Sequence, residues 1–61
     1  MIVIADNEGN QIYIHWNPKD ELVAVIACAG DLYGGVVKLD YEDVKYLIKR
    51  LQTVLKEFPN E

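Results

Sequence analysis

The chain has few of the side chains that build cross-linked or catalytic small proteins. Among its 61 residues there is one cysteine, one histidine and no serine. A lone cysteine excludes a disulfide within the chain, and one histidine with one cysteine is too few for a closed zinc site. We therefore expect no metal site, no cofactor and no catalytic residue, and we interpret the chain as a non-enzyme.

Long apolar runs and basic residues are also scarce. No run approaches the roughly 20 apolar residues of a membrane span, and Met1 leads into Ile2 without the basic region of a signal peptide. With the lone thiol, these absences predict a cytoplasmic protein with no membrane contact. The net charge of −4 makes nucleic acid an unlikely ligand, because binding to a phosphate backbone depends on clustered lysine and arginine.

The charge is unevenly distributed along the chain. Residues 1–43 hold eight carboxylates and two lysines, a balance of −6, whereas residues 44–61 have a balance of +2. Most of the acids lie in predicted turns or at a predicted helix start, where they are locally favourable.

What the chain does contain is one strongly amphipathic stretch, residues 41–58. Its apolar side chains recur at steps of three and four, which predicts one helix with an apolar stripe. The stripe consists of Val44, Leu47, Ile48, Leu51, Val54, Leu55 and Phe58. Asp40 is predicted to cap this helix, with Glu42 and Asp43 in its first turn, and Pro59 to end it.

Before the helix, short β-type segments alternate with turn signals. The predicted strands are Ile2–Ala5, Gln11–Trp16, Leu22–Ala29 and Val36–Leu39, separated by turns at residues 6–9 and 17–20 and a loop at residues 30–35. Short connections favour an antiparallel meander. The prediction is one α+β domain over residues 1–61, of order ββββα, with the C-terminal helix packed on one face of a three- or four-stranded sheet.

The turns predict which residues share a sheet face. The first turn pairs Ile4 with Ile12 and Ile2 with Ile14, and the second pairs Ile14 with Val23. One face, called face A, then carries Ile2, Ile4, Ile12, Ile14, Trp16, Val23 and Val25. We expect the helix to cover face A; whether Val36 or Val37 belongs to it stays open, because the preceding loop is ambiguous.

The opposite face, called face B, is also largely apolar. It includes Met1, Val3, Ala5, Tyr13, Leu22, Ala24, Ile26 and Cys28. No further element is predicted to cover it, and exposed apolar patches of this kind mark interaction sites. The predicted interface, with the chain itself as one partner, comprises Val3, Tyr13, His15, Leu22, Ala24, Ile26 and Cys28.

Three features were weighed for chemistry. His15 lacks a nucleophile or carboxylate partner and is predicted to lie opposite Leu22 on face B, so a surface or interface role is favoured. Cys28 has apolar neighbours, which favours an inert thiol. The glycine-rich stretch 30–35 lacks the lysine of a phosphate loop, and we expect Leu32 and Tyr33 at its tip to contact a partner.

From about Gln11 to Phe58 the pattern resembles the ββββα module of single-stranded-DNA-binding transcriptional coactivators. The carrying feature is Gly35-Val36-Val37-Lys38-Leu39-Asp40 running straight into a long amphipathic helix. The resemblance implies a homodimer that binds nucleic acid across curved sheets. This chain departs from it by its acidity and by strands almost free of basic residues, so no binding residue is transferred.

Two functional hypotheses follow. The first is a small non-enzymatic protein-interaction module, homodimeric through face B, of the kind that bacteria and phages carry as accessory or inhibitor proteins. It binds itself and an unknown protein. The alternative is a single-stranded nucleic-acid binder of the coactivator type.

Overall fold

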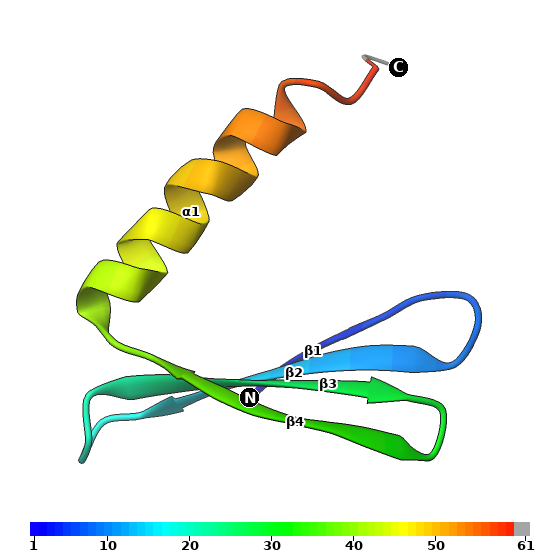
Figure 1. Cartoon of the computed structure of the whole chain (residues 1–61), viewed down its shortest axis with the longest axis horizontal. Coiled ribbons are helices and arrows are strands. Elements are labelled where there is room, and N and C mark those ends of the chain that lie inside the picture. The colour runs from blue at the N-terminus through cyan, green and yellow to red at the C-terminus, as the bar shows by residue number, and fades with distance from the viewer. Residues whose placement is uncertain (60–61) are drawn as a thin grey trace.

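The computed structural model describes residues 1–59 and shows a four-stranded sheet followed by one helix (Figure 1). The elements are β1 (Ile2–Ala5), β2 (Asn10–Asn17), β3 (Leu22–Ala29), β4 (Leu32–Leu39) and α1 (Tyr41–Leu55). The strands pair antiparallel in the order β1-β2-β3-β4. The predicted α+β class and ββββα meander are confirmed.

The first hairpin has the predicted register, with Ile4 opposite Ile12 and Ile2 opposite Ile14. Its turn is organised by Asp6, whose Oδ1 accepts from the backbone N–H groups of Glu8 at 2.8 Å and Asn10 at 2.9 Å. The Asn10 side chain donates to Asp6 Oδ2 at 2.9 Å. Local side-chain hydrogen bonds of this kind define an Asx-type turn.

The second hairpin differs from the prediction by two residues. Ile14 lies opposite Val25 rather than Val23, and His15 lies opposite Ala24 rather than Leu22. The strand continues through Asn17, whose Oδ1 accepts from Lys19 N at 3.1 Å, and the turn closes at Glu21 with a φ of 53°. Because side chains alternate with a period of two, this shift leaves every residue on its predicted face.

The third hairpin is tighter than predicted, and β4 is longer. Gly30, with a φ of 62°, allows a turn of only Gly30 and Asp31. Gly34 and Gly35, interpreted from the sequence as loop residues, lie within β4. The register shifts there, so that both glycines lie opposite Ala27 in a β-bulge.

The β3–β4 register also decides which valine belongs to which face. Val37 lies opposite Val25 and Leu39 opposite Val23, so Val37 and Leu39 belong to face A. Val36 lies opposite Ile26, on face B.

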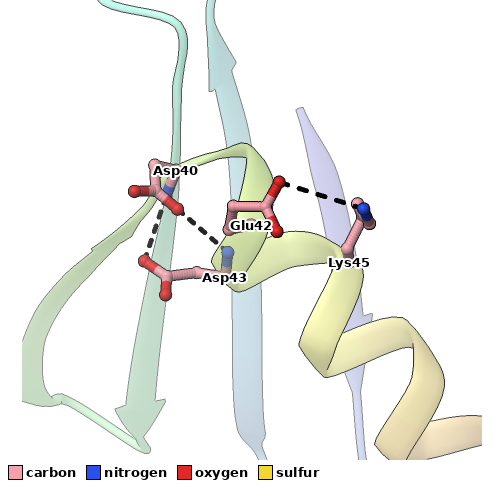
Figure 2. Close-up of polar contacts among 4 residues, drawn as sticks. All are labelled: Asp40, Glu42, Asp43 and Lys45. Atoms are coloured by element: carbon pink, nitrogen blue, oxygen red, sulfur yellow. Dashed lines mark hydrogen bonds and ion pairs between the residues drawn. The ribbon is translucent and has the colours of Figure 1, made fainter.

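Helix α1 begins immediately after β4, with Asp40 as the single residue between them. Figure 2 shows the reciprocal capping box: Asp43 N donates to Asp40 Oδ1 at 2.9 Å, and Asp40 N donates to Asp43 Oδ2 at 3.3 Å. The helix ends at Leu55, three residues earlier than predicted. Residues 56–58 form a turn, with Phe58 N donating to Leu55 O at 3.2 Å.

The predicted packing of the helix across face A is wrong. Only the first turn of α1 meets the sheet, where Tyr41 and Val44 adjoin Trp16, Val23 and Leu39. The later turns diverge from the strands (Figure 1). No side chain among residues 1–59 is buried, because α1 meets the sheet only through its first turn.

Replacing the helix cap tests this junction. Asp40→Ala removes the acceptor for Asp43 N and should lower the free energy of unfolding by about 1 kcal/mol. Asp40→Asn keeps a side-chain oxygen at this position, so its free energy of unfolding should lie within a few tenths of a kcal/mol of the parent value. Urea denaturation followed by far-ultraviolet circular dichroism, at one fixed protein concentration, measures both. Equal losses in the two variants would contradict a capping role.

The Asp6 turn predicts a pH dependence. The Asn10 side chain, then the backbone N–H groups of Asn10 and Glu8, donate to the carboxylate and hold the pKa of Asp6 below its usual value. As pH falls, the unfolded chain therefore takes up the proton first, so stability from this turn is present above about pH 4 and lost below it. The urea midpoint should fall less between pH 6 and pH 3 in Asp6→Asn than in the parent. Equal decreases of the urea midpoint in the two proteins would show that Asp6 is not the source of this pH dependence.

Candidate interaction surface

Face A is the most uniformly apolar surface of the sheet, and it is open. Along its centre, Ile14 lies opposite Val25, which in turn lies opposite Val37. Trp16 is 54% exposed and Ile4 56% exposed. A contiguous apolar surface of this kind, with nothing over it, is typical of an interaction site.

The apolar stripe of α1 is a second open surface. It includes Val44, the residue through which the first turn meets face A, so the stripe starts on the side of the helix that faces the sheet. Farther along, Leu51 is 57% exposed and Phe58 63% exposed. The far end of the stripe forms a shallow apolar groove lined by Ile48, Leu51, Val54, Leu55 and Phe58, with Gln52. Two complementary apolar surfaces therefore diverge from one junction.

Face A is hollowed at the end of the sheet farthest from the helix. The hollow has a volume of about 480 Å³, and Ile4, Ile12, Ala27 and Gly34 are among its lining residues. Gly34 is required for this shape: a Cβ there would lie 2.7 Å from the carbonyl oxygen of Ala27. Small residues at the bulge thus leave room on face A for a large side chain from elsewhere.

Face B carries the residues predicted from the sequence as an interface. The register places Val3, Tyr13 and Ile26 in one row, and His15 and Ala24 in another. Leu22 and Cys28 lie on the same face by strand alternation. Most members are half-buried within their own sheet, although Val3 and His15 are exposed.

Face B is more polar than face A. Gln11 lies opposite Cys28, and Lys38 lies opposite Ala24. The Tyr13 hydroxyl donates to Gln11 Oε1. Lys38 and Val36 were missing from the predicted surface because the sequence left the register of the last strand ambiguous.

Leu32 and Tyr33 do not lie at a loop tip. They begin β4, opposite Ala29 and Cys28 respectively. The predicted loop position is wrong, because the Gly34–Gly35 bulge resembles a loop in sequence, whereas contact of these two residues with a partner stays a prediction. Both side chains are nevertheless strongly exposed, Leu32 at 74%.

The cationic side chains of α1 lie close to aromatic rings and to a carboxylate of the same helix. On the outer side of α1, Lys45 lies 5.3 Å from the Tyr41 ring centre and Arg50 5.5 Å from that of Tyr46. Lys45 also approaches Glu42 at 3.9 Å (Figure 2). Lys38 is the sole lysine or arginine on the four strands, so the sheet offers no cationic groove for a phosphate backbone.

No group of three or more histidine, cysteine, aspartate or glutamate side chains within residues 1–59 could hold a metal ion. No helix in the same range is long and apolar enough to cross a membrane.

Comparison with models of known protein families, with curated proteins and with solved structures gives no match.

Proposed function

We propose that this chain is a small non-enzymatic protein-interaction module that works as a homodimer. The observation that carries the proposal is the absence of any buried side chain among residues 1–59. A folded domain needs a core that water does not reach, and one chain alone does not provide it.

The exposed area supports an obligate partner. The chain exposes 5594 Å², whereas a compact monomer of 7.0 kDa exposes about 4,000 Å². Its radius of gyration is 13.4 Å, against about 10.5 Å for a compact domain of this length. The excess of about 1,600 Å² falls within the roughly 1,000–2,500 Å² that each subunit buries in an obligate dimer.

Face A is the better candidate for the self-interface. The sequence predicts the second copy on face B because it also predicts that α1 covers face A. With the helix diverging, face A is open and has fewer polar groups than face B, which carries Gln11, His15 and Lys38. Desolvating those polar groups without partners would oppose association.

Face B is then free for a different protein. Its tyrosine and aliphatic side chains with a few polar groups match the composition of an interface between separately folded proteins. An accessory or inhibitor protein, which acts by binding rather than by chemistry, would use such a surface.

Matched substitutions at the centre of β3 test the dimer and its face. Sedimentation equilibrium of the parent at micromolar concentration should give twice the 7.0 kDa of one chain. Val25→Asp puts a carboxylate between Ile14 and Val37 on face A and should abolish the dimer. Ala24→Asp puts it between His15 and Lys38 on face B and should leave the dimer intact.

Trp16 supplies an independent readout of the same equilibrium. It is the single tryptophan and lies on face A, 54% exposed. Its emission should move to shorter wavelength as the parent is concentrated, and should not move in Val25→Asp. A parent that stays monomeric would refute the proposal. A dimer that dissociates in Ala24→Asp but not in Val25→Asp would show that the interface is face B.

A further inference from the structure

We infer that the homodimer forms by helix exchange: the apolar stripe of each α1 packs on face A of the other chain. This inference rests on the proposed homodimer and adds which surface meets which. The occupant of face A is a second copy of this chain.

The junction at Asp40 keeps the helix from closing on its own sheet. On one side, Leu39 is paired with Val23 in the β3–β4 ladder. On the other, Asp40 and Asp43 exchange two hydrogen bonds (Figure 2), and Val44 N donates to Asp40 O at 2.9 Å. A connection of one residue between these two sets of hydrogen bonds leaves little room to turn α1 back onto its own sheet. A short junction that holds an element away from its own domain favours exchange between copies.

In a dimer with two-fold symmetry, exchange covers face A and the apolar stripe of both copies at once. Pairing helix with helix would cover both stripes and leave both copies of face A exposed, and pairing sheet with sheet would do the reverse. The dimensions agree as well. The fifteen residues of α1 span about 22 Å, and the eight residues of β2 or β3 span about 26 Å.

Charge makes a smaller contribution to the same arrangement. Residues 1–39, which hold the sheet, carry five carboxylates and two lysines, a balance of −3, and α1 carries +1. The five carboxylates lie in the turns at the ends of the strands and not on the strands themselves. Sheet-to-sheet pairing would bring two sets of acidic turns together, whereas exchange brings the weakly basic helix of one copy to the sheet of the other.

The hollow in face A fits a helix stripe better than a second sheet. It is about 480 Å³ in volume and lies at the Ala27–Gly34 bulge. A stripe of leucine, isoleucine and phenylalanine has side chains long enough to enter it, whereas a flat sheet surface would leave it empty, and empty space weakens an interface.

Two defective variants test exchange by complementation. Leu51→Lys damages only the stripe, and Ile12→Glu damages only face A, where Ile12 lies between Ile4 and Ala27. Each alone should weaken the dimer roughly 30-fold or more, the effect of losing a central contact. An equimolar mixture should regain the dimer. One helix–sheet contact is then unaltered, and the other pairs the introduced lysine with the introduced carboxylate.

Controls of the same charge lie on the opposite sides of the two elements. Thr53 is on the side of α1 opposite the stripe, and His15 is exposed on face B, where it lies opposite Ala24. Thr53→Lys and His15→Glu should each dimerise like the parent in sedimentation equilibrium, because neither changes a contact between stripe and face A.

The outcomes separate this inference from the proposal beneath it. Recovery of dimer only on mixing supports exchange, even if each variant alone is partly unfolded, because folding would then also return on mixing. If Ile12→Glu dimerises without its partner variant, the two helices pair with each other. If Leu51→Lys dimerises without its partner variant, the two sheets pair with each other. Either result overturns exchange but is compatible with a homodimer. Two monomeric variants that do not recover together would also overturn exchange. A monomeric parent would overturn the homodimer itself.

Discussion

One residue sets the shape of this molecule. Asp40 is the last position before α1 and the first after β4, and hydrogen bonds constrain the chain on both sides of it. Its extended backbone, with φ −88° and ψ −174°, directs the helix away from face A. Helix α1 and the sheet therefore form the two arms of an open V (Figure 1).

The open V explains why the chain is so apolar for its size. An apolar fraction of 51% would be enough for a core, yet no side chain among residues 1–59 is buried. Hydrophobic burial is the main term that offsets the chain entropy lost on folding, and in the proposed homodimer the second copy supplies this burial. Folding and association of this protein are therefore expected to be one coupled process.

The sheet was largely predictable because its signals are local. The register of the first hairpin follows from the Asp6–Gly9 turn, and side-chain alternation survived the two-residue error at the second turn. That error arose because Asn17 ends a strand and its side chain also starts the turn. Gly34 and Gly35 concealed the first half of β4, since a glycine pair inside a strand resembles a loop.

The direction of the helix could not be predicted from the sequence. Periodicity shows that residues 44–58 have an apolar side, and capping shows where the helix begins, but neither reports the backbone angles of Asp40. A stripe that packs on its own sheet and one that packs on a partner's sheet have the same pattern. The sequence therefore predicts the dimer interface on face B, whereas the angle between β4 and α1 in the structure favours face A.

The most direct measurement is a nuclear Overhauser experiment on a mixed sample, in which one copy is isotope-labelled and the other is not. Filtering selects contacts between chains alone. Helix exchange predicts contacts between the methyl groups of Leu51 in one copy and those of Ile12 or Val25 in the other. The same pairs appearing only within one chain would contradict it, because the helix would then cover its own sheet.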